Sequence, residues 1–305
     1  MEKILVFGSF VVDLMARADH LPGPAETVKG NYFTMGPGGK GFNQGVAAHK
    51  VGADVAMVTK LGYDTFAEVA LSTMESLQMD TQYLLRTHDT ATGTAMVMVD
   101  EITAQNQILI VPGSCATITK EEVESLRPLI KESAYILLQL EVNFDANLAI
   151  VDIAQEYGVK VILNPAPAHA LPDTLYPLLF AVTPNEVEAE MLTGIAVTDE
   201  ASAKQAADFF FEKGVQQVII TLGSRGVFAA TREKSCLIPA NKVNAIDTTG
   251  AGDAFNGGLV AALANGADLF EACKYANVVA ALKVTHMGAS AGMPTKEEVD
   301  IFLQN

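Results

Sequence analysis

The chain has 305 residues, of which 50% are hydrophobic, so it can bury a large core without disulfides or structural metals. Its three cysteines, Cys115, Cys236 and Cys273, lie far apart, which indicates a reducing compartment and argues against a zinc site. The formal charge of −16 argues against a nucleic-acid partner, which needs a basic surface. An acidic chain can still bind a nucleotide through a local cluster of amides, lysine and Mg²⁺.

The chain begins with a continuous apolar run, residues 4–7, that ends at Gly8 and predicts a strand buried on both faces. The apolar residues up to 14 are interrupted by Asp13 and lack a cleavage pattern, so we expect a soluble cytoplasmic protein without a membrane partner. An unpaired carboxylate in such an apolar context is costly. Asp13 therefore either binds a ligand or caps a turn.

Short extended pieces, broken by Pro and Gly, occupy residues 22–37, including the stretch 27–33. A second extended pair, residues 94–100 and 107–111, is joined by a polar loop and predicts a hairpin. These pieces do not alternate with helices. We therefore expect one α/β domain, residues 1–305, with a small inserted β lid formed from about residues 12–38 and 92–112 that covers a bound substrate.

A glycine-rich segment, residues 36–44, precedes a helical pattern. It is not a Walker loop, because Gly41 rather than Ser or Thr follows Lys40. Gly39, Lys40 and Asn43 suit a polyol, since glycine permits close backbone approach and the Lys and Asn side chains donate to hydroxyls. The alternative is a turn that begins a helix and carries a solvated lysine.

From about residue 53 to 233, apolar strands alternate with amphipathic helices, which predicts a doubly wound, mostly parallel sheet. We expect strands at residues 55–58, 134–140, 159–163, 180–183 and 217–221, and helices at residues 64–77, 144–157, 186–193 and 200–213. Four strands end in a polar residue: Glu141, Asn164, Asn185 and Thr221. The carboxyl ends of strands form the ligand crevice of open α/β sheets, so these side chains should converge. Taken singly, each could be a cap or a turn residue.

Two of these strand ends suggest specific chemistry. Asn185 and Glu188 are three residues apart in a helical pattern, so both can face the crevice and hold a hydrated Mg²⁺. The glycine-rich residues 221–226 can lie under a nucleotide, with a plain β-turn as the alternative.

Residues 245–258 form a small-residue turn that leads into an alanine-rich helical pattern. The backbone amides of Gly250, Ala251 and Gly252 can bind an anionic group at this helix start. Asp253 would repel that anion, so its position is best explained if it removes a proton from the attacking group. The alternative is that Asp253 only complements the helix dipole and the glycines only form a turn.

In their order and spacing these motifs resemble the ribokinase-like carbohydrate kinases, the pfkB family, over nearly the whole chain. The resemblance implies ATP-dependent phosphorylation of a small-molecule sugar, at O5 of ribose or 2-deoxyribose, with Asp253 as general base and Gly250, Ala251 and Gly252 as the anion hole. It also implies a homodimer formed through the lid. The implied sugar-binding residues are Asp13, Gly39, Lys40, Asn43, Glu141 and Asp253; the implied ATP contacts are Asn185, Thr221, Gly223, Ser224, Gly226, Gly252 and Asn277; Glu188 and Asn185 would order Mg²⁺ through water.

Members of this family often bind a monovalent cation, usually K⁺, beside the anion hole. The matching positions, which would act mostly through backbone carbonyls, are Asp247, Thr249, Lys283, His286, Gly288 and Gly292. Gly292 departs from the family's pattern because it replaces a residue that is commonly Ser.

Family members that phosphorylate ribose carry Asn two residues before the aspartate that matches Asp13, whereas this chain has Val11. The deoxyribokinases resemble it in having an apolar residue there. Valine cannot hydrogen-bond a sugar hydroxyl, so we expect better tolerance of 2-deoxyribose. The alternatives are a kinase of another sugar or of a nucleoside, and a sensor that keeps the fold without turnover.

Overall fold

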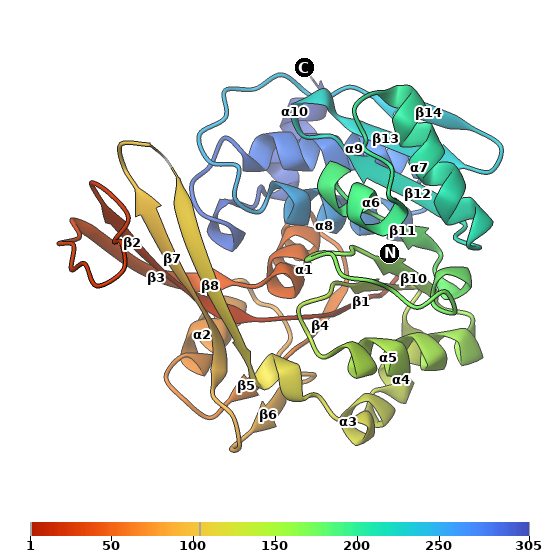
Figure 1. Ribbon diagram of the computed structural model, residues 1–305. Coiled ribbons are helices and arrows are strands. Elements are labelled where there is room, and N and C mark those ends of the chain that lie inside the picture. Colours follow the sequence, from red (N-terminus) through yellow and green to blue (C-terminus); the bar gives the residue numbers. More distant parts are fainter. Residues whose placement is uncertain (1, 104, 305) are drawn as a thin grey trace.

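The computed structural model describes residues 2–103 and 105–304 (Figure 1). Its largest sheet comprises β1 (Ile4–Phe7), β4 (Val55–Val58), β9 (Tyr135–Leu138), β10 (Lys160–Leu163), β11 (Ala181–Val182), β12 (Gln217–Thr221), β13 (Val227–Thr231) and β14 (Ser235–Ile238). Their spatial order is β14-β13-β12-β11-β10-β9-β1-β4. All neighbours from β4 to β12 are parallel, whereas β13 pairs antiparallel with both β12 and β14 at the edge. The predicted mostly parallel sheet is confirmed.

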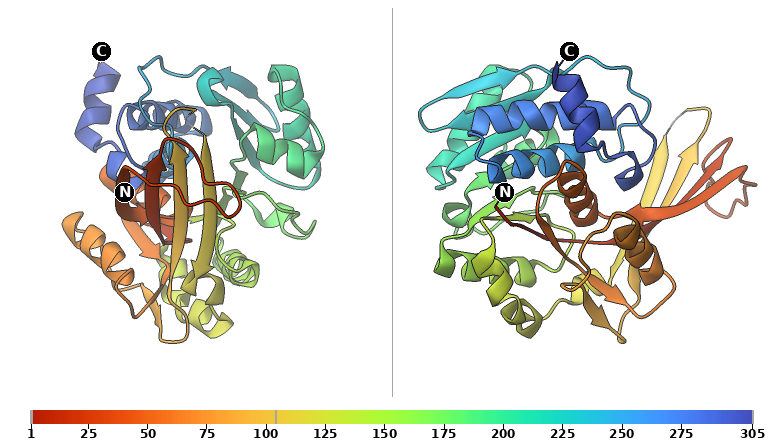
Figure 2. Two further views of the ribbon diagram at one scale, coloured as in Figure 1. Left: turned by 60° about the vertical axis from the view of Figure 1, so that its left-hand side comes forward. Right: turned by 180° about the vertical axis from the view of Figure 1, so that it is seen from behind.

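Helices cover both faces of this sheet (Figure 2). In β1, Ile4 and Val6 face one core and Leu5 and Phe7 face the other, and all four are fully buried. This two-sided burial explains why the strand is continuously apolar. The first core includes residues of α1 (Lys40–Lys50), α2 (Ala67–Ser76), α8 (Ala251–Ala264), α9 (Leu269–Lys283) and α10 (Lys296–Gln304); the second includes residues of α3 (Lys120–Ser125), α4 (Arg127–Glu132), α5 (Phe144–Tyr157), α6 (Glu186–Thr193) and α7 (Glu200–Glu212).

A second sheet projects from this body (Figures 1 and 2). It has the order β3-β2-β7-β8 and comprises β2 (Val11–Ala18), β3 (Tyr32–Gly38), β7 (Thr92–Asp100) and β8 (Asn106–Gly113). A small parallel pair, β5 (Lys60–Gly62) and β6 (Leu85–Thr87), is separate from both sheets. We refer to the four-stranded sheet as the lid.

One lid strand begins later in the chain than predicted. The extended stretch expected from residue 27 becomes a strand only at Tyr32, because the pairing of β3 with β2 ends at the Arg17–Tyr32 pair. Residues before it have no strand to pair with, and an extended sequence pattern alone does not form a ladder. Within the described ranges no helix is long and apolar enough to cross a membrane.

Helix α8 packs closely between α1 and α9. A Cβ atom on Gly257 would lie 2.5 Å from Ala47 Cβ and 2.7 Å from the Gln44 carbonyl oxygen, so any side chain would push α1 away. The neighbouring Gly258 faces α9 in the same way, and a Cβ placed on it would lie 2.9 Å from Val279 Cγ2. This close packing brings the first turn of α1 next to the first turn of α8.

Candidate active site

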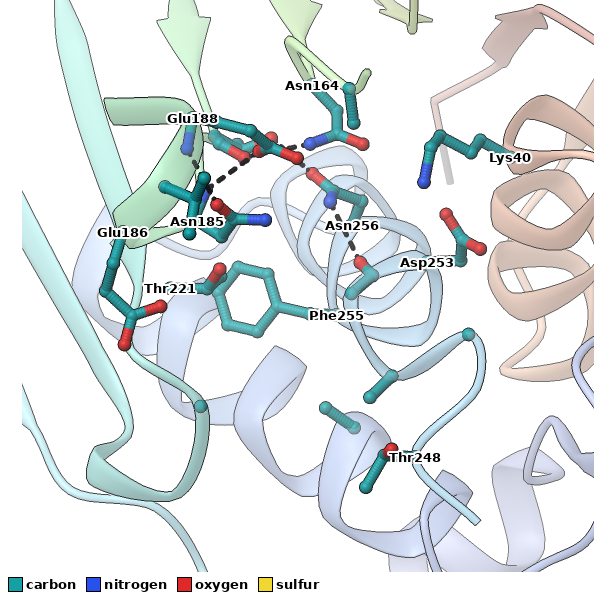
Figure 3. Close-up of a pocket in the computed structure, with 18 of the residues that line it drawn as sticks. Lys40, Asn164, Asn185, Glu186, Glu188, Thr221, Thr248, Asp253, Phe255 and Asn256 are labelled. Carbon is teal, nitrogen blue, oxygen red and sulfur yellow. Dashed lines mark hydrogen bonds between the residues drawn. The ribbon is translucent and has the colours of Figure 1, made fainter. Parts of the chain in front are cut away.

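A cavity of about 430 Å³ lies where the ends of β10, β11 and β12 meet the first turn of α8 (Figure 3). Three of the four polar residues expected at strand ends, Asn164, Asn185 and Thr221, line it. The fourth, Glu141, does not line it and instead contacts the start of α1. Other lining residues include Lys40, Thr183, Glu188, Gly223, Gly226, Gly250, Ala251, Gly252, Asp253, Asn256 and Asn277.

The first turn of α8 forms one wall of this cavity. Gly250 begins the turn with φ 77°, a left-handed conformation that favours glycine. The Ala251 amide donates to the Thr248 carbonyl (3.1 Å), whereas the amides of Gly252 and Asp253 have no acceptor within the helix. Apart from the helix itself and the two chain neighbours, no described atom lies within 4 Å of a Cβ placed on Gly252, so the space beside this residue is open. A phosphate group fits such a cradle.

Asp253 lies inside this cradle and is 8% exposed. Its Oδ1 accepts from Gln44 Nε2 and its Oδ2 from Asn43 Nδ2, both at 3.0 Å. Burial raises the pKa of Asp253 above its ordinary value, although Lys40, Gln44 and Asn43 oppose this shift. A carboxylate held in place with a raised pKa is well suited to accept a proton.

A buried hydrogen-bond network connects Asp253 to the sheet. Gln44 Nε2 also donates to Asn164 Oδ1 (3.0 Å), and Asn164 Nδ2 donates to the Thr183 carbonyl (2.9 Å). Thr183 Oγ1 then donates to Asn256 Oδ1 (2.6 Å), and Asn256 Nδ2 donates back to the Gly252 carbonyl (2.9 Å). The sequence did not predict Gln44, Thr183 or Asn256. Each lies within or beside a regular element, and its partner is distant in sequence.

On the lid side, two groups can accept hydrogen bonds from a polyol. Asn43 Oδ1 is buried without a partner among the described residues. Burial raises the pKa of Asp13 to about 6, and the negative charges of Glu141 and Asp253 contribute to this rise. A Cβ on Gly38 would lie 2.4 Å from the Asp13 carboxyl group, so the glycine allows the loop to approach it. A buried amide oxygen without a donor in the described chain and a half-buried carboxyl group fit a ligand that brings hydroxyls.

Glu141 and Lys40 lie between the lid side of the site and the amide cradle. Glu141 Oε2 accepts from Ser9 Oγ (2.5 Å) and from the Lys40 amide (2.8 Å), so this carboxylate also caps the start of α1. The Lys40 side chain points into the cavity near Asp253 (Figure 3). Burial alone would lower the pKa of Lys40, but the charges of Asp253, Glu141 and Glu188 outweigh it and raise the pKa. A protonated ammonium therefore faces the amide cradle.

The backbone conformation just before α1 requires a glycine at position 39. It has φ 92°, and a Cβ there would lie 2.9 Å from the Ser9 carbonyl oxygen. The glycine therefore shapes the loop in front of α1.

The far end of the cavity has room for a nucleotide. Gly223, at the start of the short 3₁₀ helix Gly223–Arg225, has φ 53°, and the described chain leaves its Cβ position open to 4 Å. Asn277 is buried in the wall and donates to the Pro239 carbonyl (2.8 Å). Thr221 and Gly226 line the same region. Ser224, which the resemblance included, is exposed and does not line the cavity.

Asn185 and Glu188 form a reciprocal cap on α6. Asn185 Oδ1 accepts from the Glu188 amide and Glu188 Oε2 accepts from the Asn185 amide, both at 2.8 Å. Asn185 and Glu188 thus cap the helix, which was the alternative that the sequence left open for Asn185. Both residues also line the cavity. Burial raises the pKa of Glu188, against the opposing effects of the Asn185 amide and Lys40.

The positions implied for K⁺ lie together behind the cradle. The Asp247 carboxylate accepts from the amides of Thr249 (2.9 Å) and Gly288 (2.8 Å). The Lys283 ammonium donates to the carbonyl oxygens of Asp247 (3.0 Å) and His286 (3.2 Å). The resemblance implied a K⁺ shell made mostly of backbone carbonyls, whereas in the structure the Lys283 side chain donates to two of those carbonyls.

A mostly parallel α/β sheet, a β lid and a buried carboxylate within an amide cradle together define a kinase of small molecules. The model of the pfkB family carbohydrate kinases matches residues 1–296, and the chain belongs to this family. Its predicted activity class, an ATP-dependent carbohydrate kinase, is confirmed by this membership and by the relatives.

Similar proteins cover the whole chain. The ribokinase of Haemophilus influenzae is 39% identical over 100% of each chain. A deoxyribokinase of Salmonella typhi is 36% identical over 98% of each chain. The structure of Arabidopsis thaliana ribokinase complexed with ribose and ATP has a TM-score of 0.91 at 26% identity and covers 100% of this chain and 99% of that one.

Proposed function

We propose that this kinase transfers the γ-phosphoryl group of ATP to O5 of ribose or 2-deoxyribose. The observation that carries the proposal is the position of Asp253, which lies in the amide cradle and is hydrogen-bonded to Asn43, whose Oδ1 has no partner in the part of the chain that the structure describes. The relatives named ribokinase and deoxyribokinase support this choice of sugar. Asp13, Gly39, Asn43 and Glu141 form the sugar side.

In the proposed reaction the sugar O5–H gives its proton to the Asp253 carboxylate as O5 forms a bond to the γ-phosphorus. The bond between that phosphorus and the β–γ bridging oxygen breaks, and ADP leaves. The amides of Gly252 and Asp253 and the ammonium of Lys40 stabilise the negative charge of the transferring group. Asn43 and Gln44 keep the Asp253 oxygens oriented.

The nucleotide occupies the cavity end lined by Asn185, Thr221, Gly223, Gly226 and Asn277. Mg²⁺ neutralises charge on the phosphates when bound, and Glu188 with Asn185 would hold it through water molecules. Their mutual capping leaves the second carboxylate oxygen, Glu188 Oε1, for this purpose. Carboxylate and amide oxygens are suitable partners for the water shell of Mg²⁺.

Val11 is the residue that adapts the site to 2-deoxyribose. It is 5% exposed and lies between Gly38 and Gly93, with Val11 Cγ1 2.9 Å from a Cβ placed on Gly93. An apolar side chain leaves a C2 hydroxyl without a partner there, at a cost of about 1–3 kcal/mol. 2-Deoxyribose avoids this cost.

The experiment is a coupled ADP-release assay with ribose, 2-deoxyribose, hexoses and nucleosides, on the wild type and on Val11→Asn. We expect turnover with both pentoses, and a shift of the kcat/KM ratio toward ribose of roughly tenfold in Val11→Asn. Preferred turnover of a nucleoside or hexose would replace the proposed substrate. If no acceptor were phosphorylated while ATP and a sugar still bound, the sensor alternative would stand instead.

We also propose that two copies associate through the lid. All side chains of β8 from Asn106 to Pro112 are exposed, and this group includes Ile108, Leu109 and Ile110. On the same sheet Phe33 is 66% exposed. Several large apolar side chains exposed on the strands of one small sheet, in a chain of high net charge, are typical of a protein–protein contact.

A further inference from the structure

The side chain of Lys283 occupies the place where a monovalent cation would bind. Lys283 is the last residue of α9, and its side chain is fully buried. Its ammonium donates to the carbonyl oxygens of Asp247 (3.0 Å) and His286 (3.2 Å). Two carbonyls from segments about 40 positions apart thus share one fixed positive charge.

Gly292 provides the room for this side chain. A Cβ atom on Gly292 would lie 3.3 Å from Lys283 Cε and 2.9 Å from the Met287 carbonyl oxygen. A serine at this position would therefore crowd the lysine, in addition to placing a hydroxyl beside it. The absence of a side chain at Gly292 thus leaves the space that the long side chain of Lys283 fills.

The ammonium lies behind the anion cradle. Asp247 begins the loop that ends at Gly250, and its carboxylate holds the amides of Thr249 and Gly288. The Ile246 and Asp247 amides donate to the Val284 carbonyl at 2.7 Å and 3.1 Å. The Lys283 contacts thus join the loop before the cradle to the turn after α9, and they place positive charge behind the transferring phosphoryl group.

These residues do not fit K⁺ as an additional ligand. A cation bound by the Asp247 and His286 carbonyls would lie within a few ångströms of the ammonium that already contacts both. Like charges at that separation repel strongly in a buried site, and the carbonyl dipoles cannot face both cations equally well.

We propose that the Lys283 ammonium replaces the monovalent cation, so that this kinase works without K⁺. The lysine orders the loop that carries Asp247 and supplies the charge that a bound ion would supply. The kinetic consequence rests on the proposed function, whereas the structural consequence, absence of K⁺ binding, does not.

The first test uses the wild type. Turnover is measured in KCl, NaCl and tetramethylammonium chloride at equal ionic strength, and thermal unfolding is followed in the same salts without substrates. We expect turnover and unfolding temperature to be the same in all three salts. Specific activation or specific stabilisation by K⁺ would overturn the proposal. The unfolding measurement remains informative if the sugar or the activity has been assigned wrongly.

The second test removes the ammonium. Lys283→Ala opens the carbonyl cage, so we expect at least about a tenfold loss of kcat in NaCl. KCl should recover part of this loss and raise the unfolding temperature of the variant, whereas NaCl should not. A variant that responds equally to K⁺ and Na⁺ in both measurements would contradict the proposal.

A matched control is Lys60→Ala. Lys60 is also a buried lysine, and it donates to the Thr117 carbonyl (2.7 Å) and to Glu122 (2.9 Å) in another part of the fold. Its loss should reduce stability without creating a response to K⁺. If Lys283→Ala does not fold, Lys283→Ser also removes the ammonium and leaves the carbonyl cage open, so it has the same expected response.

Discussion

The carboxylates of Asp13, Glu141 and Asp253 lie close enough together for their charges to act on the ionisation of Asp13. Glu141 and Asp253 both contribute to the raised pKa of Asp13, after the larger effect of burial. Such a cluster is unfavourable in the empty protein and becomes favourable when hydroxyls donate to it. The site therefore gives up stability for sugar binding.

The pKa of Asp13, about 6, gives a testable pH dependence. Below pH 6 the folded protein holds Asp13 protonated, and a protonated carboxyl accepts fewer hydrogen bonds, so sugar affinity should fall as the pH drops through 6. Calorimetric binding of ribose without nucleotide measures this, with the wild type compared with Asp13→Asn, in which position 13 does not titrate. Affinity that stays constant between pH 5 and 7 would show that Asp13 does not bind the sugar in its charged form.

The same shift affects stability with a definite sign. Because the folded pKa is raised above the unfolded value of 3.8, the unfolded chain releases this proton more readily. Stability is therefore lost as the pH rises from about 4 to 6. Asp13→Asn should raise the unfolding temperature at pH 8 while it weakens ribose binding.

Among single residues, the sequence predicted those whose chemistry is visible in a motif. Asp253, Lys40 and Asn43 stand in glycine-rich segments, and these residues do meet in the structure. Gln44 could not be predicted as a partner of Asp253, because they are 209 positions apart and only the packing of α1 on α8 joins them.

At the scale of elements, the α1–α8 contact determines the site geometry. Gly257→Ala would place a methyl group 2.5 Å from Ala47 Cβ and 2.7 Å from the Gln44 carbonyl, both on the helix that carries Asn43. We expect a loss of about 1–3 kcal/mol in stability and a fall in kcat of at least about tenfold, because Asn43 and Gln44 move away from Asp253.

Gly258→Ala is the matched control on the same helix. Its methyl group would meet Val279 of α9, on the side away from α1, with Cγ2 at 2.9 Å. Chemical denaturation should show a comparable loss of stability for both variants. If kcat falls equally in both, the α1–α8 spacing has no special importance for catalysis.

Most of the main-sheet elements were predictable because hydrophobic periodicity reports burial. The strand predicted at 217–221 and the helix predicted at 144–157 match β12 and α5. The antiparallel edge β13–β14 was missed, because strand direction depends on a partner rather than on local composition. The strand expected at 180–183 shortens to the two residues of β11, since only these pair with β10 and β12.

At the scale of the whole molecule, the lid combines an apolar surface with an acidic chain. Leu109 is 61% exposed on β8, so Leu109→Glu should disrupt association through the lid. Sedimentation velocity should show a wild-type dimer and a mainly monomeric variant at about micromolar concentration. The control Met191→Glu, on α6 and 64% exposed, should remain dimeric. A monomeric wild type, or an unchanged Leu109→Glu, would contradict the proposed interface.

The cation environment shows the limit of prediction at this scale. The resemblance identified the segments around Asp247 and Lys283 correctly as neighbours, and the structure joins them through Lys283. The direction of a long side chain depends on space left by distant residues, here Gly292. A sequence pattern alone could not show that the lysine occupies the carbonyl cage.

The most direct test of the account is the turnover of Asp253→Asn. Asparagine keeps the size of the side chain but cannot accept the sugar proton as a base, so kcat with ribose and ATP should fall by roughly two to four powers of ten. Calorimetry should show that ATP still binds with near wild-type affinity, and the exposed Asp152→Asn should retain full activity. A purified, folded Asp253→Asn that turns over at the wild-type rate would contradict the central claim that Asp253 is the general base of this kinase.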